Sequence, residues 1–322
     1  MAKVLCVQPL PGIGDILWFL PHMRAIAAKT PGGKITLLTK KSTQAQSLLA
    51  QEKWLEDIIW LERDRRDNAP RTQRHAGFLG RWNLGQDLKS HNFSQGWILH
   101  HSNFYAHSLW LAGVPERIGF KGDMLTQKFP LNAEEKQYHP REQVTAFLKN
   151  AGLDIRPYEK PLLFSKNAQK NIQGMFGTLS PDKKRILLGV GASEVKKMWP
   201  QKHFAELLKM FNTPEYQLIL CGGAAEEKII GDVQKACPGV DLQAAIGLDF
   251  QEVLALCASS HLYIGNDTGL MNLMVNQEKP CVVVFGPTRT LYSPLIHPLI
   301  SENATLDAVT PDMVFAKVNR VI

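Results

Sequence analysis

Short apolar runs alternate with amphipathic stretches along most of the chain. Runs such as KVLCVQ (3–8), KITLLTK (34–40) and GWILHH (96–101) are each followed by a segment with helical spacing. The alternation begins again at RILLGVGAS and continues through YQLILCGG, HLYIGND and PCVVVFGPT. This order predicts parallel strands with helices on both faces of the sheet. The nearly continuous hydrophobicity of the runs agrees, because parallel strands are buried on both sides.

The two series are separated by a polar stretch over 134–161. We therefore predict an α/β fold with two Rossmann-like domains, 1–160 and 161–305, whose parallel sheets face a central cleft. The last segment, 306–322, is expected to pack back on the first domain. Pro21 is expected to kink the first helix or to delay its start. Ligands of such sheets bind beyond the carboxyl ends of the strands, so the loops that follow strands are the candidate sites.

Composition narrows the class of protein. Of the 322 residues, 44% are hydrophobic and 21% charged, which is typical of a globular protein with a substantial core. No apolar run approaches the roughly 20 residues that span a bilayer. The N-terminus reads as a first strand rather than a signal peptide. The five cysteines are scattered without metal-binding spacing, which favours a reducing cytoplasm.

The net charge of +7 and the pI near 9.1 indicate an anionic partner. Much of the excess lies in ERDRRDNAPRTQRHAGFLGRWN (62–83), whose arginines are Arg63, Arg65, Arg66, Arg71, Arg74 and Arg81. This segment is either a solvated loop or a guanidinium-rich loop for a phosphorylated or carboxylated partner, since arginine binds such groups bidentately. Phe78 and Trp82 could contact an apolar or sugar surface. Nucleic acid is not expected as a partner, because no nucleic-acid-binding motif is present.

Two loops of the second half suit phosphate groups. In YIGNDTGLMNLMV a helix is expected to start at Asp267 or Thr268, and Gly269 allows close approach of a ligand. In GVGASEVKKMWP, Lys196 and Lys197 lie in the loop before Pro200, which is expected near the first position of the next helix. Taken singly, each loop is equally explained by an ordinary cap or a surface lysine.

Two further loops carry acids. LCGGAAEE places Glu226 and Glu227 after a strand, where a carboxylate can accept hydrogen bonds from ribose hydroxyls or merely favour a helix start. In PLPGIGD, Asp15 follows two glycines, and Leu17 breaks the dinucleotide-binding fingerprint. A lone aspartate at such a position most often caps a helix. Without a D-x-D motif or a histidine cluster, no metal is expected.

Together these loops suggest a two-domain sugar transferase with its nucleotide-sugar on the second domain. The blocks that carry a resemblance are GIGDILWFLP, KKMWPQKHFAELL, LCGGAAEE, GNDTGLMNLM and VVVFGPT. In this order they resemble the ADP-heptose:lipopolysaccharide heptosyltransferases, which are inverting glycosyltransferases of the GT-B fold. The resemblance implies transfer of heptose from ADP-L-glycero-D-manno-heptose to the lipopolysaccharide inner core, with no cofactor. It also implies a cytoplasmic protein in peripheral contact with the anionic membrane.

The same resemblance implies roles for individual residues. Asp15 matches the catalytic base and Lys197 the phosphate-binding lysine. The donor-binding set is completed by Glu226 or Glu227 at the ribose and by Asp267, Thr268 and Gly269 at the pyrophosphate. The acceptor-binding set comprises Gly14, Arg63, Arg65, Arg66, Arg71 and Arg74. Asn272 departs from the family, which usually has histidine there.

Several alternatives stay open at this point. The acceptor could be Kdo, an existing heptose or a protein hydroxyl. The chain could instead be a GT-B transferase or epimerase that uses another nucleotide-sugar, or a nucleotide- or nucleic-acid-binding module without catalysis.

Overall fold

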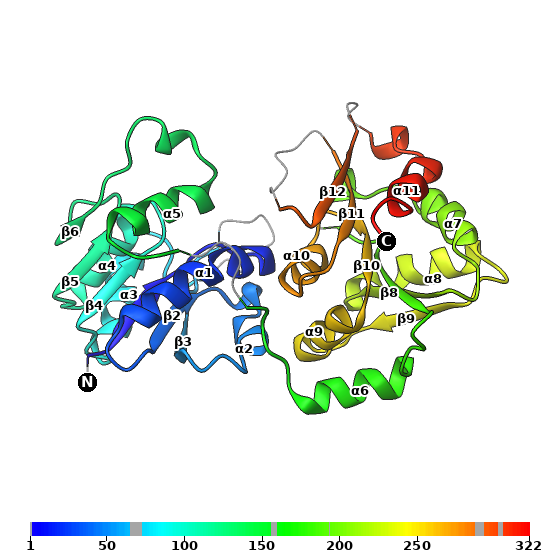
Figure 1. Cartoon of the computed structure of the whole chain (residues 1–322). Coiled ribbons are helices and arrows are strands. Elements are labelled where there is room, and N and C mark those ends of the chain that lie inside the picture. Colours follow the sequence, from blue (N-terminus) through cyan, green and yellow to red (C-terminus); the bar gives the residue numbers. More distant parts are fainter. Residues whose placement is uncertain (1, 65–72, 156–159, 193, 287–292, 302–304) are drawn as a thin grey trace. The chain divides into compact units, whose positions relative to one another are not determined.

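The computed structural model describes residues 2–64, 73–155, 160–192, 194–286, 293–301 and 305–322. The chain divides into two compact units, residues 1–160 and 161–322, and each is described by itself (Figure 1). Each unit contains one six-stranded sheet in which every pairing is parallel. The predicted α/β class with two Rossmann-like parallel sheets is confirmed.

The N-terminal sheet has the strand order β3-β2-β1-β4-β5-β6. Its strands are β1 (Val4–Val7), β2 (Ile35–Thr39), β3 (Leu55–Trp60), β4 (Gln95–Ile98), β5 (Glu116–Gly119) and β6 (Gln127–Lys128). The helices of this unit are α1 (Ile13–Lys29), α2 (Ala45–Leu48), α3 (Gly80–Lys89), α4 (Asn103–Leu111) and α5 (Pro140–Asn150). Helix α1 packs against α5, and α3 packs against α4. Right-handed crossovers explain this pairing, because the chain leaves β1 in one direction across the sheet and leaves β4 in the other.

The C-terminal sheet has the order β12-β11-β10-β7-β8-β9. Its strands are β7 (Lys184–Gly189), β8 (Tyr216–Gly222), β9 (Leu242–Ile246), β10 (Leu262–Asn266), β11 (Cys281–Phe285) and β12 (Ile296–Ile300). Its helices are α6 (Lys166–Phe176), α7 (Gln201–Met210), α8 (Glu227–Ala236), α9 (Phe250–Ser259), α10 (Gly269–Asn276) and α11 (Pro311–Val318). Helices α7, α8 and α11 pack together, and so do α6, α9 and α10 (Figure 1).

The C-terminal segment is a correction to the sequence analysis. We expected 306–322 to pack on the first domain, but α11 packs against α7 in the second. Leu306, Val314 and Val318 are buried in the same core as Phe204 and Leu188. The apolar face of α11 therefore completes the hydrophobic core of its own unit.

Helix α1 decides against one of the two alternatives expected for Pro21. It begins at Ile13 and runs through Pro21 to Lys29, so the proline does not delay its start. Proline removes one backbone donor, but the helix keeps its apolar face, with Phe19 and Met23 buried on either side of Pro21. Pro200 is the N-cap of α7, directly before its first residue, as expected.

Among the described residues, no helix combines the length and the hydrophobicity that crossing a membrane requires.

Candidate active site

Each sheet has one point where its strand order reverses direction. In the N-terminal sheet this switch point lies between β1 and β4, and in the C-terminal sheet it lies between β7 and β10. Open α/β sheets bind their ligands outside the carboxyl ends of the strands at such a point. The loops after β1 and after β7 and β10 are therefore the places where each unit can hold a ligand.

Asp15 lies in the first turn of α1, directly after the loop that follows β1. Its Oδ2 accepts a hydrogen bond from the backbone N–H of Gly12 at 2.7 Å, which caps the helix. Its Oδ1 has no hydrogen-bond donor among the residues that the structure describes. Capping therefore occupies one carboxylate oxygen and leaves the other available to accept a proton.

The surroundings of Asp15 alter its affinity for a proton. Partial burial raises the pKa of the Asp15 carboxyl, while the Gly12 hydrogen bond and the positive charge of Lys40 act in the opposite direction. Lys40 directly follows β2, and its Nζ lies 3.7 Å from Oδ1 of Asp64, beyond the end of β3. The sequence analysis missed Lys40. Its position directly after an apolar strand, at the same sheet edge as Asp15, is the signal that could have found it.

The structure describes only some of the predicted acceptor-binding residues, and these lie in different surroundings. Gly14 lies beside Asp15 in the first turn of α1. The Arg63 guanidinium lies over the Phe104 ring, 4.2 Å from its centroid, and so is held against the start of α4. Arg65, Arg66 and Arg71 lie outside the described residues.

Arg74 is engaged within the N-terminal unit. It binds both carboxylate oxygens of Asp87 on α3, with Nε 2.6 Å from Oδ2. The Arg74 guanidinium lowers the pKa of Asp87 to about 2; partial burial opposes this shift, and a hydrogen bond from His75 adds to it. The bidentate fork that we assigned to an acceptor is thus already occupied by a carboxylate of this chain.

At the C-terminal switch point, a buried amide joins three backbone segments. Asn266, at the end of β10, accepts a hydrogen bond from the N–H of Trp199 at 2.8 Å. Its Nδ2 donates to the carbonyl oxygens of Val190 and Gly191, both at 3.0 Å. Asn266 therefore fixes both ends of the loop that carries Lys197. The sequence analysis missed this residue, although a polar side chain at the end of an apolar strand is a recognisable signal.

Thr268 is the N-cap of α10, and its Oγ1 accepts a hydrogen bond from the N–H of Met271 at 3.5 Å. The expected helix start is confirmed at Thr268, with Gly269 as the first helical residue. The first-turn N–H groups give this end a partial positive charge that suits a phosphate. Asn272 donates from Nδ2 to the carbonyl oxygen of Thr268 at 2.9 Å, so this amide interacts with its own helix.

The two loop lysines differ in their surroundings. The Lys197 side chain is 28% exposed and its Nζ lies 3.7 Å from Oε1 of Glu194. Lys196 is 72% exposed and binds Oε2 of the same glutamate at 2.8 Å. Burial raises the pKa of Asp267, and the charge of Lys197 opposes that shift. Lys197 is therefore the lysine whose charge reaches the start of α10.

The two glutamates are also distinguished by the structure. Oε2 of Glu226 accepts from the N–H of Gly223 at 2.8 Å. A Cβ added at Gly191 would lie 2.4 Å from Cγ of Glu226, and one at Gly222 would lie 2.7 Å from its Cβ. Glu226 thus lies over the carboxyl ends of β7 and β8, where only glycine leaves it room, whereas Glu227 is exposed.

The part of the chain that the structure describes contains no candidate metal site. No three His, Cys, Asp or Glu side chains come together there in a way that could hold a metal ion. Metal-free chemistry remains a prediction from the sequence.

Comparisons with known proteins identify the class of enzyme. The family model for glycosyltransferase family 9 (heptosyltransferase) matches residues 81–312. Lipopolysaccharide heptosyltransferase 2 of Salmonella typhimurium is 24% identical over 314 residues, which cover 91% of this chain and 85% of that protein.

Two solved structures share the fold. ADP-heptose lipopolysaccharide heptosyltransferase II of E. coli superimposes with a TM-score of 0.74 at 22% identity, covering 99% of this chain and 98% of that one. E. coli heptosyltransferase WaaC with ADP-2-deoxy-2-fluoro heptose gives a TM-score of 0.72 at 19% identity, covering 99% of both chains. The chain belongs to glycosyltransferase family 9, the heptosyltransferase family, and is a glycosyltransferase of the GT-B fold.

Proposed function

We propose that this enzyme transfers heptose from ADP-L-glycero-D-manno-heptose to the inner core of lipopolysaccharide, with inversion at the anomeric carbon. The observation that carries the proposal is the match of residues 81–312 to the heptosyltransferase family. The relative in S. typhimurium is a lipopolysaccharide heptosyltransferase, and the WaaC structure contains an ADP-heptose analogue, which supports the donor and the acceptor class.

Asp15 is the proposed general base. Its Oδ1 accepts the proton of the acceptor hydroxyl while that oxygen attacks the anomeric carbon and the bond from this carbon to ADP breaks. Partial burial, which raises the pKa of Asp15, makes it a stronger base than an exposed aspartate. The Gly12 hydrogen bond to Oδ2 holds the carboxylate in one orientation. Nearby Lys40 stabilises the ionised form that must accept the proton.

The proposed donor site lies at the carboxyl edge of the C-terminal sheet. The first-turn amides of α10 and the Lys197 ammonium bind the diphosphate, on which negative charge increases as the sugar departs. Groups placed where charge develops lower the barrier most effectively. Asp267 lies beside these groups, and we assign the ribose hydroxyls to Glu226 rather than the exposed Glu227.

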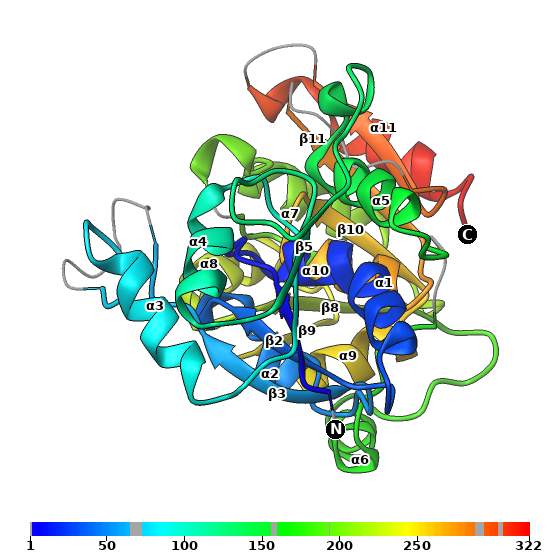
Figure 2. The same ribbon diagram turned by 90° about the vertical axis from the view of Figure 1, so that its left-hand side faces the viewer.

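Peripheral contact with anionic membrane on the cytoplasmic side is also proposed. The Phe78 side chain is fully exposed and Trp82 is 53% exposed, and both lie within the basic segment 62–83. Helix α3, which begins directly after Phe78 and Leu79, lies at the margin of its unit (Figure 2). Aromatic side chains beside basic ones suit the interface of an anionic bilayer.

The proposal is tested by product analysis. The full chain is incubated with ADP-heptose and, separately, with UDP-sugars, in each case with a mixture of Kdo-terminated and heptose-terminated acceptors. We expect mass spectrometry to find a product only with ADP-heptose, and NMR of that product to show the inverted anomeric configuration. Transfer from a UDP-sugar instead would reject the donor, and a retained configuration would reject the single displacement.

A further inference from the structure

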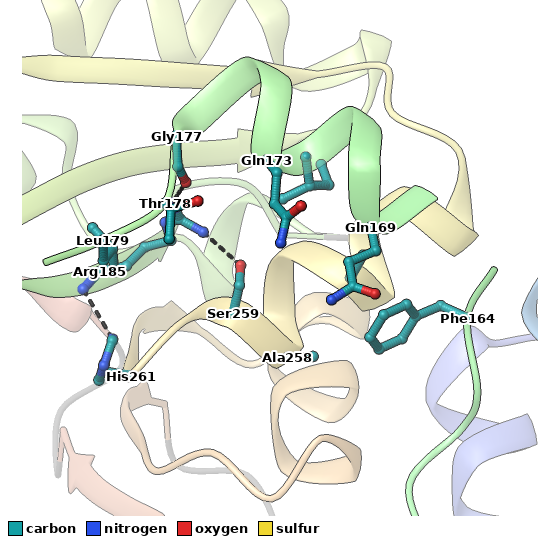
Figure 3. A pocket seen from close by; sticks show the side chains of 12 residues that line it. Phe164, Gln169, Gln173, Gly177, Thr178, Leu179, Arg185, Ala258, Ser259 and His261 are labelled. Carbon is teal, nitrogen blue, oxygen red and sulfur yellow. Dashed lines mark hydrogen bonds between the residues drawn. The ribbon is translucent and has the colours of Figure 1, made fainter. Parts of the chain in front are cut away.

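A cavity lies within the C-terminal unit at the amino end of β7, away from the glycine loops. It has a volume of about 290 Å³ and lies between α6 and α9 (Figure 3). Its lining includes Phe164, Ile172, Gln173, Arg185, Ser259 and His261. Arg185 precedes Gly189 by four residues on the same strand, so the cavity is roughly 13 Å from the candidate donor edge.

Arg185 places a buried positive charge at this cavity. The residue is 2% exposed. Its Nε donates to Oε1 of Gln217 at 2.8 Å and its Nη1 to Oγ of Ser259 at 2.6 Å. Its Nη2 donates to the carbonyl oxygens of Phe176 and Gly177 at 3.2 and 3.0 Å. All four acceptors are neutral, and no carboxylate among the described residues pairs with this guanidinium.

That arrangement leaves both charge and hydrogen-bonding capacity unmatched. A buried cation without a counter-ion is unfavourable, and burial accordingly lowers the pKa of Arg185. A guanidinium has five N–H bonds, and one of those on Nη1 has no acceptor in the described part of the chain. An anion entering the cavity would supply both the missing acceptor and the missing charge.

Arg185 is not the only source of positive charge at the cavity. His261 lies next to it, with Nδ1 accepting from the backbone N–H of Arg185 at 3.1 Å. Burial and then the charges of Lys279, Arg185 and Lys184 lower the pKa of His261. Every charged group that acts on this histidine is a cation. The field therefore favours an anion from more than one direction.

The remaining lining is largely apolar. Phe164, Ile172, Leu179, Ala255 and Ala258 contribute carbon surface to the cavity, and Figure 3 shows the Phe164 ring and the Gln169 amide on the same side of it. We propose that the cavity binds a small organic carboxylate with a compact apolar body, its head group beside Arg185. The single unused N–H favours a singly charged head over a phosphate dianion. This site is separate from the proposed sugar transfer.

Binding is tested with benzoate, with benzamide as the neutral analogue and with inorganic phosphate as an anion that has no apolar body. Affinities for the full chain are measured by saturation-transfer NMR and calorimetry. We expect benzoate to bind at least tenfold more tightly than either control compound. Ala258→Phe, which fills the cavity, should weaken benzoate binding at least tenfold, whereas Lys228→Gln on α8 should leave it unchanged.

A second variant tests the charge at the cavity without adding a bulky side chain to the core. Lys184→Gln removes one of the cationic charges that act on His261 but no lining group, and should weaken benzoate binding severalfold. Equal binding of benzoate and benzamide would overturn the anionic assignment, and preference for phosphate would overturn the carboxylate. No binding of benzoate up to about 10 mM would overturn the site. The affinity for ADP should be the same in Ala258→Phe and wild type, so this outcome is independent of the proposed donor site.

Discussion

Asp15 has a structural role as a helix cap and, in the proposed mechanism, a chemical role as the base. Oδ2 caps α1 through Gly12, and a Cβ added at Gly12 would lie only 2.9 Å from that oxygen. The carboxylate is therefore held by the backbone rather than by other side chains. The two roles can be separated, because asparagine retains an oxygen for the cap but cannot act as a base.

Asp15→Asn should lower kcat about 10²- to 10⁴-fold, the usual contribution of a general base, while thermal stability and ADP affinity stay close to wild type. Asp15→Ala should lose the same activity and also about 1 kcal/mol of stability, because the cap is lost as well. Steady-state kinetics, calorimetric titration and urea unfolding measure the three quantities. Transfer by Asp15→Asn within a few-fold of wild type would rule out Asp15 as the base.

Lys197 and Lys196 form a matched pair for testing the donor site. Lys197→Ala should weaken ADP binding about tenfold, or about 1.4 kcal/mol, because it removes a charge that reaches the start of α10. Lys196→Ala should change it less than about twofold, since that ammonium is well exposed to solvent. Isothermal titration with ADP measures both. A larger loss from Lys196→Ala would reverse the assignment.

Lys40 and Asn266 were missed by the sequence analysis for the same physical reason. Asp15, Lys197 and Glu226 were singled out as candidates because each stands in a glycine-rich or family-like loop. Lys40 and Asn266 act through groups far away in the sequence, namely Asp15 for Lys40 and Gly191 and Trp199 for Asn266. The position of each residue at the end of an apolar strand was visible in the sequence, but only the folded strand order shows which groups it acts on.

At the scale of elements, the interior strands were predicted except for β5, and the edge strands were not. β1, β7 and β10 are buried along nearly their whole length and read as apolar runs. β3, β9 and β12 lie at sheet edges and are mostly half-buried or exposed. An edge strand packs on fewer neighbours, so its sequence lacks the continuous hydrophobic pattern. Helix α5 falls within the stretch that the sequence analysis described as polar, because only Val144, Phe147 and Leu148 of this helix are buried.

Membrane contact can be tested at Phe78, which lies just before α3, and at Trp82, which lies in its first turn. Phe78→Ser with Trp82→Ser should lower binding to phosphatidylglycerol vesicles about tenfold, because both aromatic rings would lose their apolar contact with lipid. Co-sedimentation at low and high salt measures this. Trp110→Ser on α4 is the control, since Trp110 is 51% exposed but is not part of the basic segment 62–83. An equal loss in both variants would argue against a specific role for this segment.

For the whole molecule, each unit closes its own core, and the stability of the first depends on a buried histidine. His22 on α1 lies 2.8 Å, Nε2 to Oγ1, from Thr145 on α5. Burial, followed by the charge of Arg141, lowers the pKa of His22 to about 3, from an ordinary value of 6.5. Between these values the unfolded chain binds a proton that the folded chain does not.

The stability of the N-terminal unit should therefore be greatest above pH 6.5 and should fall as pH drops from 6.5 towards 3. The contribution of His22 to this slope is at most about 1.4 kcal/mol per pH unit. Urea unfolding from pH 7 to pH 4.5 measures it. His22→Gln should flatten the slope, whereas His101→Gln, at an exposed position, should not. An unchanged slope in His22→Gln would show that other groups cause the acid sensitivity.

The buried amide of Asn266 has a consequence for how the loops of the proposed donor site respond to mutation. Its nitrogen faces two carbonyl oxygens and its oxygen faces one N–H, so both halves of the group are specified. Exchange of that nitrogen for an oxygen, as in aspartate, would keep the shape of the side chain and turn two attractions into repulsions. The loop that carries Lys197 is thus anchored by the chemical identity of one atom rather than by the bulk of a side chain.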